Sequence, residues 1–256
     1  MDIHIEQGEG LLTLTLNRPA YKNALTHAMY TTMSNALQHA ENDKTIKVVL
    51  IKGQGTCFTS GNDLNDFLNN PPNEKEAPAL RFLHTLSNCP QPLVAQVEGL
   101  AVGVGSTLLL HCDLVYASTQ ANFSMPFVRL GLCPEGASSA LLPLVAGYQK
   151  AAQWLLLGDT FTAQQANEAG LVTSVLPPQD IEAHVQTQLT KLLNLPAHSL
   201  RESKKLMKMH LKAHVTRTIE QEANTFLSMI PRPEAQEAFR AFGEKRQPNF
   251  RQFDHD

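Results

Sequence analysis

Two periodicities alternate along the first half of the chain. Residues 3–19 alternate apolar and polar side chains on both sides of a Gly8–Gly10 turn, which predicts a β-hairpin that ends at Pro19. Residues 25–40 repeat apolar positions at helical spacing and predict a helix. β-Branched and apolar runs closed by turn residues predict strands at 46–55, 92–99, 114–118 and 122–126. A glycine-opened apolar run at 103–113 predicts a buried helix between the strands at 92–99 and 114–118.

The proportion of predicted strands and helices changes near Leu141. From there to the end the chain has helical patterns, with breaks at Gly158, Gly170 and 177–178. Strands that alternate with helices, followed by a helical C-terminal part, predict the α/β class. The prolines and charges of residues 69–78 predict an exposed, mobile loop of the kind that covers binding sites.

Composition narrows the possible functions. With 256 residues, 43% of them hydrophobic, the chain can bury a large core in one domain with at most a smaller appendage. The net charge of -3 provides no basic field for a nucleic acid. Four cysteines without a CxxC pair suit reduced thiols, and no signal peptide, membrane span or peroxisomal tripeptide is present. We therefore expect a soluble cytoplasmic protein that binds neither nucleic acid nor membrane.

Two glycine-rich turns each follow a predicted buried strand. The first, "CFTSGNDL", spans residues 57–64, and the second, "VEGLAVGVGS", spans residues 97–106. The second turn matches neither a P-loop nor a dinucleotide fingerprint. Each turn can present free backbone N–H groups to a developing negative charge, or it can simply be a tight turn that needs small residues. Asp63 by itself is most simply a helix cap.

The remaining candidate groups are few. The histidines lack metal-ligand spacing, so we expect no metal site, and no G-x-S-x-G elbow occurs. The basic helix at residues 203–214 suits a solvated face or a subunit contact. Glu135 stands alone in the uncharged run "LGLCPEGASSALLPL". An apolar pocket would raise its pKa toward neutrality and favour proton transfer, whereas a place in the first turn of a helix would make it a structural acid.

Taken in order, these segments resemble the crotonase superfamily of enoyl-CoA hydratases and isomerases. The resemblance rests on "LNRPAYKNAL", "CFTSGNDL", "QPLVAQVEGLAVGVGSTLLLHCDLVYAS", "ANFSMPFVRLGLCPEGASS" and "LLLGDTFTAQQANEAGLVTSVLP", in register over most of the chain. It implies a ββα spiral core over residues 1–195 and a helical C-terminal region over 196–256 used for trimerisation. It also implies a homotrimer or a dimer of trimers.

The resemblance further implies an acyl-CoA thioester as substrate and no separate cofactor, since coenzyme A (CoA) is part of the substrate. In this family the thioester oxygen is held by two backbone N–H groups, which by position belong to Asn62 and Val104. Hydratases place two glutamates around a water molecule, and the matching positions here are Thr107 and Phe127. Without those carboxylates, efficient hydration is not expected.

Glu135 instead resembles the single acid of Δ3,Δ2-enoyl-CoA isomerases. One carboxylate can take a proton from C2 and return it at C4, because both atoms lie on one side of the dienolate. Thr107 and Phe127 would then line a drier substrate pocket, which also draws on a mobile segment near residues 69–88. By the same resemblance, further CoA contacts are expected from the turns and the C-terminus, at Lys22, Ala24, Leu25, Ser60, Asn62, Leu64, Lys245 and Phe250.

Two other functions stay open at this point. The same enolate-stabilising site could serve a hydratase or another crotonase-type acyl-CoA reaction. Alternatively, the chain could be a catalytically idle acyl-CoA-binding homologue, since such a relative could keep its acid.

Overall fold

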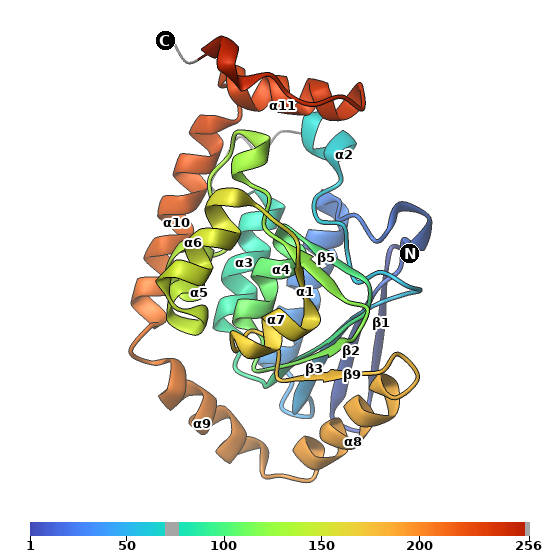
Figure 1. Cartoon of the computed structure of the whole chain (residues 1–256). Coiled ribbons are helices and arrows are strands. Elements are labelled where there is room, and N and C mark those ends of the chain that lie inside the picture. The colour runs from blue at the N-terminus through green and yellow to red at the C-terminus, as the bar shows by residue number, and fades with distance from the viewer. Residues whose placement is uncertain (70–76, 254–256) are drawn as a thin grey trace.

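The computed structural model describes residues 1–69 and 77–253, which form a mixed α/β core with a helical arm along one side (Figure 1). The main sheet has the strand order β1-β2-β3-β4-β6-β9, and β5-β7-β8 form a smaller sheet. β1 and β2 pair antiparallel, and the other pairs of the main sheet are parallel. The main-sheet strands are β1 (Ile3–Gly8), β2 (Leu11–Leu16), β3 (Val48–Gly53), β4 (Leu93–Val97), β6 (Leu114–Ser118) and β9 (Ser174–Leu176). The small-sheet strands are β5 (Leu100–Val102), β7 (Asn122–Ser124) and β8 (Phe161–Thr162).

The helices cover the sheet on both faces and then continue beyond it. The first seven are α1 (His27–Asn42), α2 (Leu64–Asn69), α3 (Pro78–Asn88), α4 (Val104–Thr107), α5 (Ser138–Ala146), α6 (Tyr148–Leu157) and α7 (Ala163–Glu168). The last four are α8 (Ile181–Leu193), α9 (Ala197–Lys208), α10 (Lys212–Met229) and α11 (Pro233–Gly243). Short 3-10 turns lie at η1 (Pro19–Tyr21), η2 (Leu108–His111), η3 (Val128–Leu130) and η4 (Phe250–Phe253).

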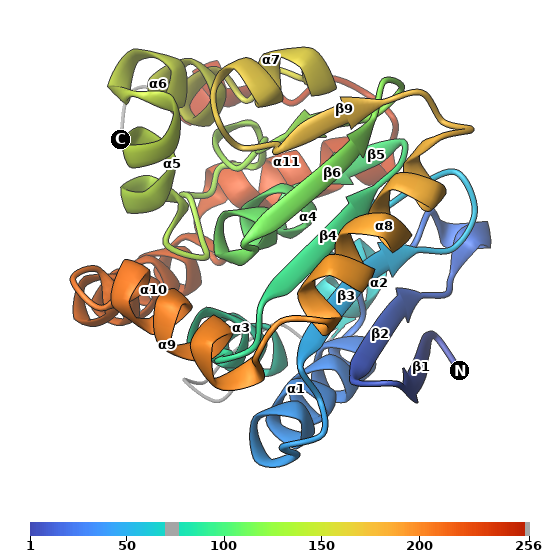
Figure 2. The same ribbon diagram turned by 90° about the horizontal axis from the view of Figure 1, so that it is seen from below.

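The parallel strands are buried on both faces, as their apolar sequences require. Helix α8 lies across one face of the sheet, where Val48, Leu50, Val94 and Tyr116 pack against Ile181 and its helical neighbours (Figure 2). The opposite face contributes Val49, Ile51, Ala95 and Val115 to the larger core cluster. Alternate residues of β3, β4 and β6 therefore serve two separate cores.

The sequence predictions for the N-terminal half are largely confirmed. The hairpin turns at Glu9 and Gly10, whose positive φ angles of 51° and 87° suit a two-residue hairpin turn. The helix predicted at 25–40 begins at His27, because the Thr26 side chain accepts a hydrogen bond from Met29 N–H and caps it.

The structure modifies three predictions about the elements. The buried helix expected at 103–113 is one α-helical turn, α4, followed by the 3-10 turn η2. The part after Leu141 is not wholly helical, since β8 and β9 add two short strands. The loop expected at 69–78 falls mostly on residues 70–76, outside the described residues. The second half of the supposedly mobile segment 69–88 is helix α3, with Phe82, Leu83 and Leu86 buried.

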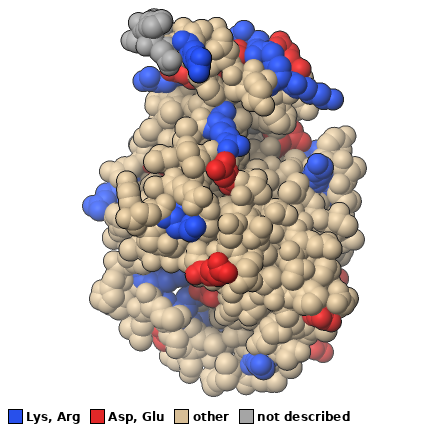
Figure 3. Space-filling model, in the orientation of Figure 1, with Lys and Arg blue, Asp and Glu red and all other residues tan. Residues whose placement is uncertain are grey.

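Helix α10 packs against α3 and α5 and so closes the core from the side (Figure 1). The proposed boundary between residues 195 and 196 falls just before α9, and its role as a domain boundary stays a prediction. Helices α5 and α6 expose large apolar side chains, at Leu144, Val145, Tyr148, Leu156 and Leu157. The face of the molecule seen in Figure 3, where these helices lie, carries few charged side chains.

All four cysteines carry free thiols. Within residues 1–69 and 77–253, no helix is long and apolar enough to cross a membrane.

Candidate active site

The first glycine turn is clamped between two neighbouring segments. Leu25 N–H donates to the Gly61 carbonyl at 2.8 Å, and Asp63 N–H donates to the Leu25 carbonyl at 2.9 Å. These two bonds bracket Asn62, so that its own N–H points away from Leu25. On the other side, Thr59 forms a parallel bridge with Ala101.

The second turn ends at the N-terminus of α4. Gly103 has a φ of +57°, and its carbonyl accepts the N–H groups of Ser106 and Thr107. Val104 is the first residue of the helix, where a backbone N–H has no partner within the helix. The Val104 N–H is thus positioned as a donor at a helix N-terminus.

The two turns lie in direct contact. A Cβ atom on Gly61 would stand 2.8 Å from the Val102 carbonyl oxygen, and one on Gly105 would stand 2.5 Å from Cγ2 of Thr59. Glycine is therefore required at both positions for close approach of the turns. Sequence alone could not show this convergence; whether the N–H groups of Asn62 and Val104 share one oxyanion stays a prediction.

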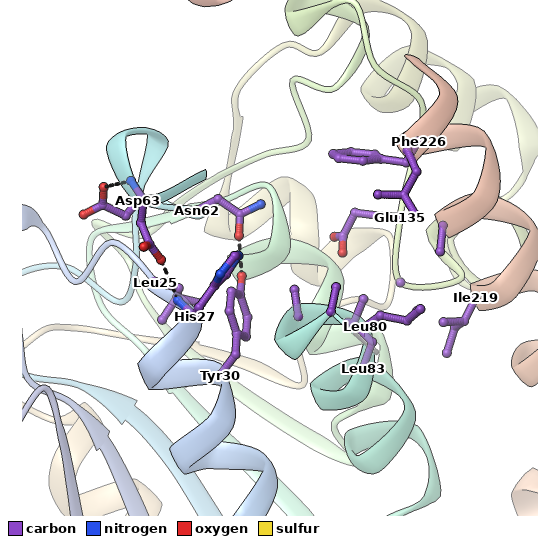
Figure 4. A pocket seen from close by; sticks show the side chains of 16 residues that line it. Leu25, His27, Tyr30, Asn62, Asp63, Leu80, Leu83, Glu135, Ile219 and Phe226 are labelled. Carbon is purple, nitrogen blue, oxygen red and sulfur yellow. Dashed lines mark hydrogen bonds between the residues drawn. The ribbon is translucent and has the colours of Figure 1, made fainter. Parts of the chain in front are cut away.

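A pocket opens beside the first turn (Figure 4). One end of the pocket is polar and the other is apolar. The polar lining residues are His27, Tyr30, Asn62, Asp63, Asp66 and Glu135. The apolar wall is supplied mainly by α3 and α10, through Ala77, Ala79, Leu80, Leu83, Ile219, Ala223, Phe226 and Leu227. Residues 77–83, from the segment near 69–88 that was expected to shape the acyl pocket, contribute to this lining, while the use of the pocket for an acyl chain stays a prediction.

Glu135 projects into the apolar part of the pocket, between Phe226 and the pair Leu80 and Leu83 (Figure 4). Helix α5 begins only at Ser138, so Glu135 is not the first-turn helix residue that one interpretation of the sequence allowed. Burial raises its pKa from 4.5 to about 7, a hydrogen bond from the Thr107 hydroxyl opposes the shift, and the nearby carboxylate of Glu222 adds to it. At neutral pH Glu135 can therefore both accept and release a proton.

Two more carboxylates stand among the described residues of the pocket, and both have structural partners. Asp63 forms an ion pair with Arg18 at 3.0 Å and accepts the N–H groups of Asn65 and Asp66, which confirms its predicted role as a helix cap. Asp66 accepts the His27 N–H at 2.7 Å and so joins α2 to the start of α1.

Tyr30 is a site residue that the sequence analysis missed. Its hydroxyl donates to Oδ1 of Asn62 at 2.5 Å, on the side of the pocket opposite Glu135 (Figure 4). Burial raises the Tyr30 pKa well above its ordinary value, so the phenol stays protonated and acts as the donor. The bond turns the amide nitrogen of Asn62 toward the pocket (Figure 4). Helical periodicity places Tyr30 on the buried face of α1 but gives no signal for the partner of its hydroxyl.

Two buried side chains behind Glu135 were also missed. His111, which showed no site pattern in the sequence, contacts the Gly136 carbonyl through Nε2 at 2.8 Å. Glu222 accepts the N–H groups of Ala137 and Ser139. Neither could be found from spacing, because their partners lie far away along the chain.

The predicted CoA-contact residues of the N-terminal half lie together. Leu25 lines the pocket, and Ser60 N–H donates to the Lys22 carbonyl at 3.0 Å. Ala24 is buried beside them, and Leu64 begins α2. These residues thus surround the first glycine turn, while their contact with CoA stays a prediction.

The structure does not bring the other predicted contacts into this pocket. Lys245 is exposed just after α11, and Phe250 lines a second cavity, between η3 and the end of α10. Phe127 is buried in the core at the start of η3 and is not among the described residues that line the first pocket. Thr107, by contrast, contacts Glu135 directly.

The chain is similar to a group of acyl-CoA enzymes. A family model described as enoyl-CoA hydratase/isomerase matches residues 6–253. The chain is 36% identical over 247 residues to "Enoyl-CoA delta isomerase 3, peroxisomal" of Mus musculus. The aligned region covers 94% of this chain and 78% of the mouse protein. It is 40% identical over 222 residues to "Enoyl-CoA delta isomerase 2" of Rattus norvegicus, and this alignment covers 84% of this chain. The match spans only 56% of that rat protein.

Two further similarities widen this group. The "2,3-dehydroadipyl-CoA hydratase" of Escherichia coli K12 is 32% identical over 257 residues, with 98% of each chain covered. The solved structure of an enoyl-CoA hydratase/isomerase from Pseudoalteromonas atlantica superposes with a TM-score of 0.94 at 38% identity, over 98% of this chain and 100% of that one.

Proposed function

The chain belongs to the enoyl-CoA hydratase/isomerase family, and we propose that it acts as a Δ3,Δ2-enoyl-CoA isomerase with Glu135 as its single proton carrier. The observation that carries this proposal is the environment of Glu135. Among the described residues that line the pocket, it is the carboxylate that has neither a cation nor a helix end as partner, and burial raises its pKa to about 7. The family assignment confirms the predicted crotonase fold.

The proposed reaction consists of two proton transfers, both through the carboxyl group of Glu135. Ionised Glu135 takes a proton from C2 of a 3-enoyl-CoA, and the electrons of the broken C–H bond form a dienolate. Protonated Glu135 then returns the proton at C4, which leaves the double bond between C2 and C3. The atoms balance without a further reactant, so the CoA thioester is the only other component that the scheme needs. A pKa near neutrality serves both steps.

The negative charge of the dienolate falls on the thioester oxygen. We propose that the N–H groups of Asn62 and Val104 hold this oxygen, because their turns touch and Val104 opens a helix. Donors of this kind contribute roughly 3 to 4 kcal/mol each to a transition state. The apolar wall around Glu135 excludes water, which strengthens these contacts.

The names of the relatives include both isomerases and a hydratase, so similarity alone does not choose the reaction. The side chains at the two hydratase acid positions favour the isomerase. Thr107 supplies a hydroxyl that bonds Glu135, and Phe127 supplies no polar group. A water molecule would therefore lack the pair of carboxylates that activates it.

The lining also favours an uncharged acyl chain. The wall from α3 and α10 is apolar, and no Lys or Arg is among the described residues that line the pocket. A dicarboxylyl chain would bury a second carboxylate there without a cation, which is costly. We therefore propose a fatty 3-enoyl-CoA as the substrate class.

The test uses cis and trans 3-enoyl-CoAs of several chain lengths and follows the absorbance of the conjugated product. The wild type should isomerise them, while Glu135→Gln should lose about 10²- to 10⁴-fold in kcat. The exposed Glu220→Gln on α10 provides a matched control and should keep wild-type turnover. Wild-type turnover in Glu135→Gln would refute the mechanism, and faster hydration of crotonyl-CoA than isomerisation would favour a hydratase. Binding without any turnover would identify an idle homologue.

A further inference from the structure

Glu222 lies directly behind the segment that carries Glu135. Its side chain comes from α10 and is 7% exposed. Oε2 accepts the Ala137 N–H at 2.5 Å, and Oε1 accepts the Ser139 N–H at 2.9 Å. A carboxylate that accepts two backbone N–H groups near a helix start is held in one orientation and stabilises that start.

The segment that Glu222 holds has an unfavourable backbone. Gly136 and Ala137 follow each other with φ angles of +68° and +60°. A residue with a Cβ atom adopts this left-handed conformation at a cost and keeps it only where its surroundings impose it. Glu222 accepts hydrogen bonds from the N–H groups of Ala137, which has this left-handed conformation, and of Ser139, two residues later. Through these two bonds α10 holds the backbone in that conformation.

A second contact, from the 3-10 turn η2, holds the same segment. Burial lowers the pKa of His111 to about 4, so the ring is neutral and its Nε2–H donates to the Gly136 carbonyl at 2.8 Å. Residues 136–139 are thus held from η2 by His111 and from α10 by Glu222. Glu135, at the start of this segment, has little freedom to turn out of the pocket.

Glu222 also connects the segment to the wall of the pocket. Ile219, Ala223 and Phe226 lie on the same helix within four residues of Glu222, and all three line the pocket. One side chain therefore sets the distance between the acyl-binding wall of α10 and the carboxylate of Glu135.

We propose that Glu222 is a positioning residue for the proton transfer: it fixes Glu135 relative to the α10 wall, and its negative charge tunes the protonation of Glu135. This inference rests on the proposed role of Glu135. Glu222 does not reach the pocket lining itself, so it acts through Glu135 and touches no reacting atom.

The charge of Glu222 has a definite sign of effect. It raises the pKa of Glu135, because a second carboxylate nearby disfavours ionisation. The titratable groups that face Glu135 or line the same pocket are Tyr30 from α1, Glu222 from α10, His111 behind Gly136, Cys133 on the same segment, and His27, Asp63 and Asp66 at the polar end. Removing the charge of Glu222 alone should lower the pKa of Glu135 and move the acid limb of kcat to lower pH.

Glu222→Gln tests this inference with the smallest change of shape. The amide keeps one acceptor oxygen but loses the second acceptor and the charge. We expect kcat to fall about 10- to 100-fold with KM within about twofold, since a hydrogen bond to a charged group is lost from the positioning of Glu135. The exposed neighbour Glu220→Gln removes a charge from the same helix without these contacts and should change neither constant.

Two measurements need no turnover and so separate this inference from the proposed function. The first is the carboxyl titration of Glu135 by NMR, which should move to lower pH in Glu222→Gln. The second is amide exchange at Ala137 and Ser139, which should become faster in Glu222→Gln and Glu222→Asp. If the wild type fails to isomerise any 3-enoyl-CoA, the proposed function is wrong, but these readouts still decide whether Glu222 positions Glu135.

A merely structural role predicts something different. Glu222→Gln would then lose thermal stability, yet its folded fraction would keep the wild-type kcat, acid limb and Glu135 titration. That result would overturn the inference. Should Glu222→Gln fold poorly, Glu222→Asp keeps the charge and both oxygens on a shorter arm. It should retain the acid limb of the wild type while kcat falls; an unchanged kcat in Glu222→Asp would likewise count against positioning.

Discussion

The Thr107 hydroxyl donates a hydrogen bond to Oε1 of Glu135, and so helix α4, which begins at the second glycine turn, is joined to the proposed proton carrier. The bond stabilises ionised Glu135 and opposes the effect of burial on its pKa. Thr107→Val should therefore raise the pKa of Glu135 above about 7 and move the acid limb of kcat/KM to higher pH. Activity at pH 7 should fall about 3- to 10-fold, because a rise of about one pKa unit would leave only about a tenth of Glu135 ionised at that pH.

A pH–rate profile checks this, with Thr107→Ser as the matched control because serine keeps the hydroxyl. Thr107→Ser should retain the acid limb of the wild type. An identical profile for the valine variant would show that the hydroxyl does not act on Glu135.

Glu135 should also make the folded chain less stable as the pH rises. Its pKa is about 7 when folded and near 4.5 when unfolded, so between these values the folded state binds more protons. The free energy of unfolding should therefore fall from pH 4.5 to pH 7, by an amount on the order of 3 kcal/mol from this group. Glu135→Gln removes this term, because glutamine does not titrate.

Urea denaturation of both proteins at pH 5, 6 and 8 measures the difference. The advantage of Glu135→Gln over the wild type should grow with pH and level off above pH 7. A constant difference at all three values would mean that the folded protein does not raise the pKa of Glu135.

Tyr30→Phe removes the donor to Oδ1 of Asn62 and leaves that oxygen without the partner. The free energy of unfolding should fall by about 0.5–1.5 kcal/mol, the net contribution of a typical hydrogen bond, because Asn62 lines the open pocket and water can replace the lost donor. We also expect kcat/KM to fall about tenfold, because the Asn62 turn loses its side-chain anchor. Tyr148→Phe, at a position that is 70% exposed, is the control and should change neither quantity. Wild-type kcat/KM in Tyr30→Phe would show that the anchor has no part in turnover.

The assembly prediction concerns three or six copies of the 28.2 kDa chain. Light scattering after gel filtration measures the mass directly. If residues 196–256 make the trimer contacts, Leu206→Asp with Met207→Asp should lower the mass, since both exposed side chains lie on α9. If the double variant keeps its mass while Leu144→Asp with Leu156→Asp lowers it, the contacts lie on α5 and α6 instead.

Local patterns sufficed for much of the fold. The alternation around Gly8–Gly10 and the β-branched runs at 46–55 and 92–99 predicted strands that the structure contains, since each pattern depends on near neighbours. The strands β8 and β9 escaped because two or three residues are too short for a period to show. Helix α3 escaped because the prolines and charges just before it dominated the interpretation of that segment.

The sequence by itself determined the α/β class, the two glycine turns and the presence of one acid in an apolar run. Those features depend on the order of residue types along a short stretch. Only the tertiary structure decided what surrounds Glu135, because its partners lie 28 residues away at Thr107 and far along the chain at Glu222. The burial that raises the pKa of Glu135 arises because α3 and α10 close over it. Periodicity describes only near neighbours along the chain, so it does not encode the approach of these distant helices to Glu135.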